Sequence, residues 1–324
     1  MNPSPDLSVV MGVYNAGDRL RPTLDSVLGQ QGCELEFIVV DDGSTDNTAS
    51  LLDAAAQADA RLRVIHQANT GLTRALIAGC AAARAPFIAR QDAADVSLPG
   101  RLQQELQVLR ADAEIAFVSC ATEYVEPGGA LLYRNAGSGK AAQPRNVIDM
   151  TQTYGMADGP SHHGSVMFRR DAYEQAGGYR AEFYFGQDWD LWFRLAQLGK
   201  FAMLPQTLYR ATLGVGDISA GNKPQQEQLA LLSLQALRLR LQGESEAPAL
   251  EQAATIRPQP RQGGRRKSVA AGSYFIGECL RRNGNAPRAR EYFLQALHEQ
   301  PWSAKTWVRL AQTAFAPGTA KTSC

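Results

Sequence analysis

Two stretches of the sequence place carboxylates directly after an apolar run of strand length. Asp41 and Asp42 follow the run Glu36 to Val40, and Asp92-Ala93-Ala94-Asp95 follows the run Pro86 to Ala89. Carboxylates at a strand end can accept hydrogen bonds from the base or ribose of a nucleotide, or hold a hard divalent cation that bridges phosphates. Capping of the next helix is the alternative interpretation for both stretches.

A third acidic position, Asp188, falls near the start of a predicted helix, in which Leu191 and Leu195 recur at helical spacing. The helix dipole favours a carboxylate there, and simple capping is again the alternative. The neighbouring pair His162-His163 could suggest a metal site. Adjacent side chains diverge, however, and a merely packed or exposed histidine pair is the commoner case.

These positions are carried by an alternation of strands and helices, which is the pattern of βαβ units on a mostly parallel sheet. We expect strands at Leu7 to Val13, Glu36 to Val40, Leu62 to His66, Pro86 to Ala89 and Ile115 to Ala121. We expect helices near Leu20 to Gln30, Thr48 to Ala58, Leu72 to Ala83 and Pro99 to Arg110. In open α/β sheets ligands bind at the carboxyl ends of the strands, where the carboxylates lie.

The composition of the chain limits the class of protein and its expected location. The chain has 324 residues, a formal net charge of +1 and 44% hydrophobic residues, which predicts a globular protein and argues against a dedicated nucleic-acid binder. The sequence has no apolar run of membrane-spanning length and no signal-peptide pattern at its start, so we expect a cytoplasmic location. The five scattered cysteines form no C-x-x-C pair and are expected to be reduced thiols.

The C-terminal third reads as a separate helical extension. We expect a first domain over 1–222, a helical connector over 223–256, a basic Pro/Gly linker over 257–272 and a helical segment over 273–316. That last segment has the spacing of one tetratricopeptide repeat, with small residues at Gly277, Ala289 and Ala296, and with Leu280 and Phe293 filling the space between two helices.

A single repeat is too short to be stable alone, so it should pack on the first domain, on the helix Gln225 to Leu241, or on another subunit. A protein partner or self-association through these helices is therefore expected. The basic linker could contact an anionic inner-membrane surface, or be a solvated connection. Gly128 to Gly159 is weakly patterned and predicts a long loop.

The motifs, taken together and in order, resemble the family 2 glycosyltransferases of the GT-A fold, over about Leu7 to Ser219. They are Met11-Gly12-Val13-Tyr14-Asn15, V-D-D-G-S-T-D-N-T ending at Thr48, N-T-G-L-x-x-A-L from Asn69, R-x-D-A-x-D-x-S-x-P-x-R-L from Arg90, H-x-S-V-M-F-R-R from His163, G-G-Y at Gly177, and D-x-D-L-W-x-R-L from Asp188.

The resemblance implies roles by position. The nucleotide pocket would be lined by Val13, Tyr14 and Asn15, with Asp42 and Asp41 on the uracil or ribose and with Asn69 and Arg90 near the diphosphate. The D-x-D metal motif falls on Asp92-Ala93-Ala94, and the general base falls on Asp188. The acceptor side is assigned to His163 and Asp190.

The chain departs from the family pattern at two positions. Ala94 stands where the second Asp of D-x-D is usual, so Mg²⁺ or Mn²⁺ binding would require Asp95 as a substitute, which needs the turn to shift by one residue. Without a cation, the charge on the leaving group would have to be neutralised by a basic residue, for which the candidates are Arg90, Arg169, Arg170 and Lys140. Gly12 stands where proline is common, a change expected to affect stiffness more than chemistry.

The function implied is inverting transfer of a sugar from a nucleoside-diphosphate sugar, most simply a UDP-sugar, to a glycan or lipid-linked acceptor in cell-surface polysaccharide synthesis. The main alternative is a non-catalytic nucleotide-sugar-binding or assembly subunit with a degraded metal site. A nucleotidyltransferase activity agrees less well with the sequence, because the first predicted strand is not followed by a Gly-rich, basic loop that would bind a triphosphate.

Overall fold

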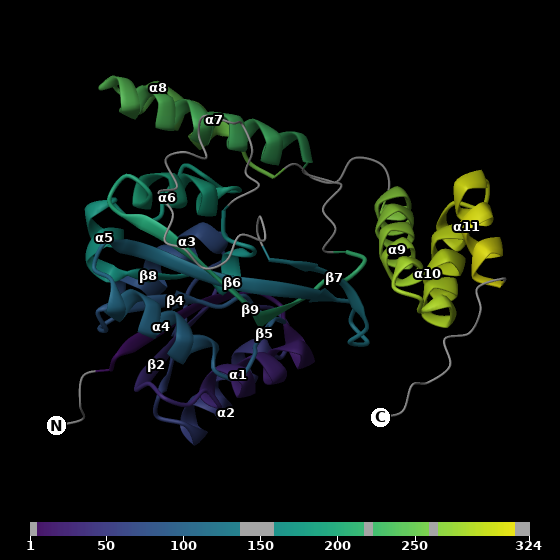
Figure 1. The fold of residues 1–324 in the computed structure, drawn as a ribbon, viewed down its shortest axis with the longest axis horizontal. Coiled ribbons are helices and arrows are strands. Elements are labelled where there is room, and N and C mark those ends of the chain that lie inside the picture. The colour runs from purple at the N-terminus through teal and green to yellow at the C-terminus, as the bar shows by residue number, and fades with distance from the viewer. Residues whose placement is uncertain (1–4, 137–158, 217–222, 259–264, 315–324) are drawn as a thin grey trace. The chain divides into compact units, whose positions relative to one another are not determined.

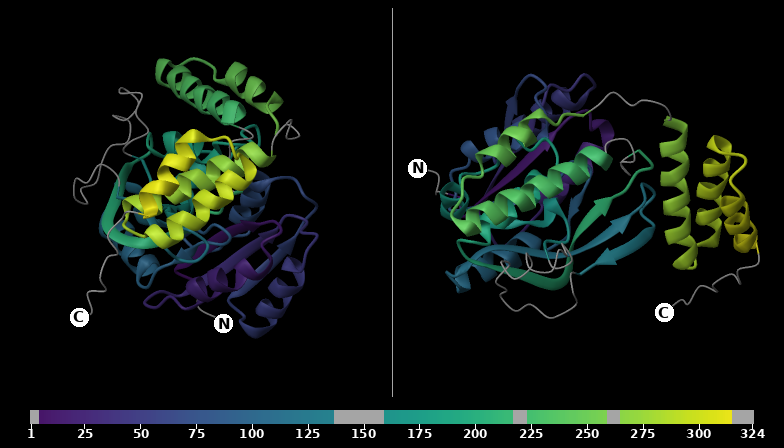
Figure 2. Two further views of the ribbon diagram at one scale, coloured as in Figure 1. Left: turned by 90° about the vertical axis from the view of Figure 1, so that its right-hand side faces the viewer. Right: turned by 90° about the horizontal axis from the view of Figure 1, so that it is seen from above.

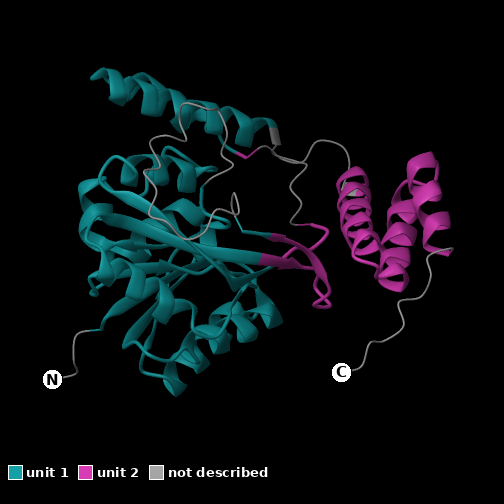
Figure 3. Ribbon diagram, in the orientation of Figure 1, with its two compact units in different colours: residues 1–122, 135–211, 224–257 teal, residues 123–134, 212–223, 258–324 magenta. Residues whose placement is uncertain are grey.

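The computed structural model describes residues 5–136, 159–216, 223–258 and 265–314 (Figure 1). The chain forms two compact units (Figure 3). Unit 1 contains residues 1–122, 135–211 and 224–257, and unit 2 contains residues 123–134, 212–223 and 258–324. Within the described ranges, no helix is long and apolar enough to cross a membrane, and none of the cysteines is in a disulfide.

The first four strands form the parallel half of one mixed sheet. Their order is β3-β2-β1-β4, with bounds β1 Leu7–Val13, β2 Leu35–Asp41, β3 Leu62–His66 and β4 Phe87–Arg90. The register sets Val13 opposite Asp41 and Val10 opposite Arg90. Strands β1, β2 and β4 are buried along their whole length, as expected for parallel strands covered on both faces.

The other half of the sheet contains antiparallel pairs. Strand β8 (Met167–Arg169) pairs with β4, and the order continues through β6 (Ile115–Val125), β9 (Lys200–Thr212) and β5 (Val96–Ser97). The predicted fold class is confirmed, but the parallel arrangement is confined to the first four strands. Within the range predicted as a loop, β7 (Leu131–Asn135) is a strand paired with β6, which corrects that prediction; 137–158 lie outside the described residues.

Helices of unit 1 connect and cover the strands (Figures 1 and 2). They are α1 Leu20–Leu28, α2 Thr48–Ala58, α3 Leu72–Ala81, α4 Arg101–Ala111, α5 Arg170–Gln175, α6 Gln187–Leu195, α7 Lys223–Gln242 and α8 Ala247–Thr255, with short 3₁₀ turns at Gly17–Arg19 and His163–Ser165. The main core joins β1, β4, β6 and β8 to α3, α5 and α6. Helices α7 and α8 share a second cluster with the buried ring of Phe183.

Unit 2 contains α9 (Arg265–Arg282), α10 (Ala286–Glu299) and α11 (Ala304–Ala314). A Cβ on Gly277 would lie 2.9 Å from the ring of Phe293, so the predicted close approach of two helices at a small residue is confirmed. Because α9 begins at Arg265, residues 265–272 are helical and the expected linker was drawn too long. Arg, Lys and Ala are good helix formers, and the stretch dense in Pro and Gly ends at Gly264, before α9 begins.

The helices of unit 2 pack on the tip of the β6–β7 hairpin, residues 123–134. The buried carboxylate of Glu126 accepts hydrogen bonds from Arg288 at 2.9 Å and from the Tyr292 hydroxyl at 2.8 Å. Asn283 Nδ2 donates to the carbonyls of Leu131 and Leu132 at 2.8 Å. The hairpin therefore supplies the surface that a helical segment of this length requires.

Candidate active site

The site is built at the carboxyl ends of β1, β2 and β4. Val13 ends β1 and Asp41 ends β2, and these two residues are register partners. Arg90 ends β4, and Asp92 follows it after one residue. Parallel strands present their carboxyl ends at one edge of the sheet, so the topology brings the predicted residues to one side of unit 1.

The turns after β1 and β2 are fastened to each other. Asn15 adopts a left-handed conformation (φ +50°), its backbone N–H donates to Ser44 Oγ at 3.0 Å, and its Oδ1 accepts from the Thr45 N–H at 2.8 Å. Val13 is buried, whereas the Tyr14 side chain is half-exposed. The Tyr14 side chain is therefore accessible at the end of β1, and its contact with a nucleotide stays a prediction.

Asp41 and Asp42 are both buried and are held by the protein itself. Asp42 accepts from the N–H groups of Thr70 (2.9 Å) and Gly71 (2.8 Å), and Asp41 accepts from Ser44 N–H and contacts His66 Nδ1 at 2.9 Å. Burial tends to raise the pKa of Asp41, but the hydrogen bonds from Ser44 and His66 outweigh it and leave the pKa lowered. Contact of either carboxylate with a nucleotide stays a prediction.

Asn69 is brought next to this turn by a close backbone approach. Gly43 has φ +74°, and a Cβ there would lie 2.7 Å from the backbone nitrogen of Asn69. Only glycine fits both the conformation and the space. The Asn69 side chain is exposed, so the predicted position beside a diphosphate remains open to it.

Arg90 does not have the predicted role. Its side chain is fully buried, and Nη1 donates to the carbonyls of Val10 (2.6 Å) and Gln91 (3.0 Å), Nη2 to Asp92 Oδ1 (2.5 Å) and Nε to His163 Nε2 (3.3 Å). A guanidinium with these donors occupied and no exposed surface cannot reach a diphosphate. Arg90 instead fixes the carboxylate of Asp92.

Asp92, Asp95 and His162 converge. A ligand atom from each lies within 4.8 Å of the others, with His162 Nδ1 3.7 Å from Asp92 Oδ2 and His162 Nε2 3.8 Å from Asp95 Oδ2. Ala94 between the two aspartates has φ +70°, a conformation that costs an alanine about 1–2 kcal/mol. This left-handed residue lets the turn bring Asp95 beside Asp92, as the substitution of Asp95 for the missing aspartate requires.

The donor set fits a hard divalent cation. Two carboxylates from one turn are typical protein ligands of Mg²⁺, and Mn²⁺ also accepts imidazole. His162 Nδ1 accepts the backbone N–H of Gly164 at 3.0 Å, so in a neutral ring the proton lies on Nε2. The carboxylates of Asp92 and Asp95 are therefore the better ligands, and His162 is placed to donate toward Asp95.

Two residues outside this turn hold it, and neither was predicted as a site residue: Tyr209 lies far along the chain, and Arg101 lies six residues after Asp95. The buried Tyr209 hydroxyl on β9 donates to Asp95 Oδ2 at 3.0 Å and accepts from the Asp92 N–H at 3.1 Å. The buried Arg101 of α4 donates to the Arg90 carbonyl at 2.9 Å and to Ser97 Oγ at 2.8 Å. A lone Tyr in a strand carries no signal of such contacts, but Arg101 lies within the matched R-L motif.

Asp188 is the second residue of α6. Burial raises the pKa of this carboxyl to about 6, and the negative charge of Asp92 contributes to the rise. Among the described residues no cation forms an ion pair with it, and its Oδ1 accepts the N–H of the next residue, Trp189, at 3.0 Å. A carboxylate without a salt bridge whose pKa lies near neutrality is suited to accept a proton.

His163 and Asp190 were both assigned to the acceptor side, but they differ in exposure and in their interaction partners. His163 is partly exposed; its Nε2 lies 2.8 Å from the Tyr179 hydroxyl, and burial lowers its pKa to about 3, so the ring is neutral. Asp190 is fully buried and pairs with Arg194 at 2.5 Å. Asp190 is removed from an acceptor by this burial and by its ion pair, although it lies only two residues after Asp188.

Arg169 and Arg170, two of the basic residues proposed to neutralise the leaving group, lie away from Asp92. Arg169 pairs with Phe87 at the start of β4, opposite its Asp92 end, and donates to the Ile115 carbonyl at 2.8 Å. The backbone N–H of Arg170 bonds the Pro86 carbonyl at the same end. Neither can neutralise charge near Asp92. Lys140 lies outside the described residues.

Comparisons with known proteins agree with this geometry. Residues 8–177, about half of the chain, match the profile of glycosyl transferase family 2. EpsE of Bacillus subtilis, a protein named as a glycosyltransferase, is 32% identical over 216 residues, covering 65% of this chain and 74% of EpsE. Chondroitin synthase of Pasteurella multocida is 25% identical over 224 residues, which are 69% of this chain but 22% of the synthase.

Among solved structures, S. aureus TarS 1-349 superposes with a TM-score of 0.57 at 14% identity, covering 95% of this chain and 88% of that one. A structure of the same TarS fragment in complex with UDP gives a TM-score of 0.58 at 16% identity, covering 95% and 80%. At this identity the similarity establishes the fold, in which both chains share the GT-A arrangement.

Proposed function

Because the chain belongs to family 2 of the glycosyltransferases, we propose that it transfers a sugar from a UDP-sugar to a hydroxyl group of a glycan or lipid-linked acceptor, with inversion at the anomeric carbon. The TarS fragment has been crystallised with UDP and with UDP-GlcNAc, which supports a uridine nucleotide as the donor. A matching synthase of a polysaccharide, chondroitin, supports a role in surface polysaccharide synthesis.

The observation that carries the proposal is the contrast between Asp188 and Asp92. Asp92 is tied to the buried cation of Arg90 and its pKa is lowered, whereas Asp188 has no ion-pair partner among the described residues and its pKa is raised to about 6. Two nearby carboxyl groups with opposite pKa shifts are suited to different tasks. One stays ionised and the other exchanges a proton near neutral pH.

In this mechanism Asp188 accepts the proton of the acceptor hydroxyl. The hydroxyl oxygen forms a bond to the anomeric carbon while the bond from that carbon to the β-phosphate oxygen breaks, and the electron pair leaves with UDP. Neutral His163 lies in hydrogen-bonding contact with Tyr179 and Arg90, where it can help to position an acceptor hydroxyl. A single displacement of this kind inverts the anomeric configuration.

Asp92 and Asp95 would hold a Mg²⁺ or Mn²⁺ ion, with His162 beside them. When bound, such an ion neutralises charge on a departing diphosphate. Arg90, Tyr209 and Arg101 fix the turn that carries both carboxylates. We propose that this support compensates for the absence of a carboxylate at Ala94.

The test is release of UDP from a panel of UDP-sugars, measured with Mn²⁺, with Mg²⁺ and with EDTA, in the presence of polymeric and short glycan acceptors. We expect turnover with one donor, an anomeric configuration in the product opposite to that of the donor, and loss of turnover by at least 10²-fold in Asp188→Asn. Asp171→Asn, a carboxylate in the first turn of α5, is the matched control and should remain active.

The non-catalytic alternative is favoured only by Ala94. It predicts donor binding without turnover, together with wild-type function of Asp188→Asn in a cellular glycan assay. Retention of the donor's anomeric configuration would contradict the single displacement but not the family assignment.

A further inference from the structure

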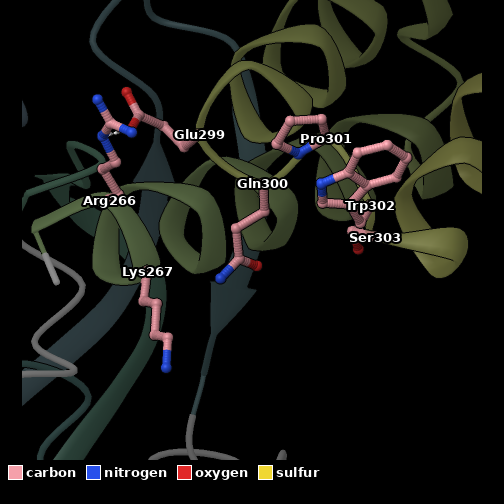
Figure 4. A pocket seen from close by; sticks show the side chains of 7 residues that line it. All are labelled: Arg266, Lys267, Glu299, Gln300, Pro301, Trp302 and Ser303. Carbon is pink, nitrogen blue, oxygen red and sulfur yellow. Dashed lines mark ion pairs between the residues drawn. The ribbon is translucent and has the colours of Figure 1, made fainter.

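A hollow lies within unit 2, between the start of α9 and the turn that joins α10 to α11. Its volume is about 580 Å³, and its walls include Arg266, Lys267, Glu299, Gln300, Trp302 and Ser303 (Figure 4). None of these residues belongs to the candidate active site. Ligand sites are typically concave and combine an aromatic surface with a few polar groups, as this hollow does.

Trp302 is the most exposed large hydrophobic side chain in the described part of the chain, at 95% of its full surface. Burying an indole is ordinarily favourable, so a tryptophan with almost all of its surface exposed is available for contact with a ligand. Both faces of the ring are open. Its electron-rich face is suited to the partly positive C–H groups on one face of a pyranose ring.

The polar groups of the hollow complement a sugar that carries negative charge. Arg266 lies 3.9 Å from Glu299, a long pair in which the arginine side chain is 85% exposed. Within the described residues Lys267 has no ion-pair partner, and Figure 4 shows its ammonium group and the Gln300 amide extending into the same open space. An amide, a hydroxyl and a free ammonium can bind sugar hydroxyls together with a carboxylate or phosphate.

From this arrangement we propose that the hollow around Trp302 is a carbohydrate-binding site for an anionic oligosaccharide, separate from the donor site. A pyranose stacks on Trp302, Lys267 pairs with an acidic substituent, and Gln300 and Ser303 bind hydroxyl groups. In a glycosyltransferase, an anionic oligosaccharide bound here would be the acceptor. This identification of the acceptor class rests on the proposed transferase function. The binding itself does not require turnover.

A membrane surface is the competing occupant, because Trp and Lys also bind lipid headgroups. Two features favour a glycan. Arg266, Lys267 and Gln300 border a hollow of about 580 Å³, which has room for a sugar ring beside the exposed Trp302. Glu299 would face the anionic headgroups of a bilayer. Carboxylate and amide groups beside a tryptophan are instead useful for binding sugar hydroxyls.

The experiment is titration calorimetry on the full chain without any nucleotide, using two acidic hexasaccharides, one bearing glucuronate carboxylates and one bearing sugar phosphates, with neutral maltohexaose for comparison. We expect saturable binding of at least one acidic probe and weaker binding of maltohexaose. Trp302→Ala should weaken binding at least tenfold. Lys267→Gln should weaken binding and reduce its dependence on salt.

Val308→Ala is the matched control, since Val308 is an exposed apolar residue of the same unit that does not line the hollow; it should bind like the unchanged chain. The inference is overturned if no acidic probe binds, if Trp302→Ala binds normally, or if Trp302 is required only for binding to vesicles of phosphatidylglycerol and phosphatidylcholine. Because no donor is present, an inactive enzyme that still binds the probe would contradict the proposed function and leave this site intact.

Discussion

The Nη2 atom of Arg90 lies 2.5 Å from Oδ1 of Asp92, and the arginine side chain has no exposed surface while the aspartate is one-quarter exposed. One partner of this ion pair therefore belongs to the core and the other to the site. A fully buried guanidinium is stable only with its partners in place. The geometry of the predicted metal turn is thus coupled to the packing of β4.

Arg90→Lys should weaken both folding and the site. Lysine keeps the charge, but a single nitrogen cannot serve Val10, Gln91, Asp92 and His163 together. We expect a loss of about 3–5 kcal/mol in the free energy of unfolding, measured by urea denaturation, and a higher Mn²⁺ concentration at half-maximal turnover.

Arg21→Lys is the control, because it alters an exposed ion pair on α1, and it should change the free energy of unfolding by less than about 0.5 kcal/mol. An unchanged Mn²⁺ requirement in a folded Arg90→Lys protein would contradict the positioning role.

Asp188→Asn should stabilise the protein at pH 7–8 while it removes activity. Burial raises the pKa of Asp188 from its ordinary value of 3.8 to about 6 in the folded state, so the folded state binds the proton more tightly. The stability that this proton provides is fully present below pH 3.8 and is lost as the pH rises through 6. Thermal unfolding at pH 8 should show Asp188→Asn more stable by on the order of 2–3 kcal/mol, with no difference at pH 3.5.

The same group should set the acidic limb of the activity profile. Turnover of the unchanged chain should fall below about pH 6, because the proton acceptor becomes protonated. A profile without this limb would assign proton transfer to another group.

Ala94→Asp tests whether the site lacks a ligand. Aspartate tolerates the left-handed conformation better than alanine and adds a carboxylate between Asp92 and Asp95. We expect half-maximal turnover at about a tenfold lower Mn²⁺ concentration, or about 1.4 kcal/mol of added binding free energy. Ala93→Asp adds the same charge one residue earlier, so an equal effect of both variants would indicate general electrostatic attraction rather than coordination.

Glu126→Gln should loosen the helices of unit 2 from the hairpin tip. Burial tends to raise the pKa of Glu126, but hydrogen bonds from Arg288, the Gly128 N–H and Tyr292 lower it to about 2. The stability from this carboxylate is present above pH 4.5 and is lost as the pH falls toward 2. At pH 7 the variant should be less stable by on the order of 2–3 kcal/mol, and the difference should vanish near pH 2.

Glu291→Gln removes the exposed partner of the same Arg288 and should cost less than about 1 kcal/mol. Hydrogen exchange of the α10 amides would localise the effect. Equal losses in the two variants would mean that the exposed pair, and not the buried carboxylate, holds the helices.

The fold and the positions of the acidic groups could be predicted because they depend on short-range patterns. Apolar runs that end in Asp41 and Asp92 define strands with polar carboxyl ends, and parallel strands bring those ends to one edge. The helical spacing after Asp188 likewise indicated the start of α6. Each of these predictions rested on residues that are close in the sequence, within about one helical turn or one strand of the predicted residue.

What could not be predicted depends on distant contacts. The burial of Arg90 and the ion pair of Asp190 follow from neighbours that packing supplies, so the resemblance to the family assigned both residues to a ligand. Gly12 is a further example. A Cβ there would lie 2.9 Å from Leu72 and 3.2 Å from Ala75, so the glycine makes room for α3, which the local sequence does not reveal.

The buried hydroxyl of Tyr209 accepts from the Asp92 N–H and from Gln91 Nε2, which occupies both lone pairs of its oxygen. Its single hydrogen has then only Asp95 Oδ2 as a destination. Replacing tyrosine with phenylalanine would therefore delete one atom and leave three polar groups of the turn without their partner. One phenol oxygen, contributed from the opposite half of the sheet, thus fixes the direction in which Asp95 presents its remaining lone pairs to the site.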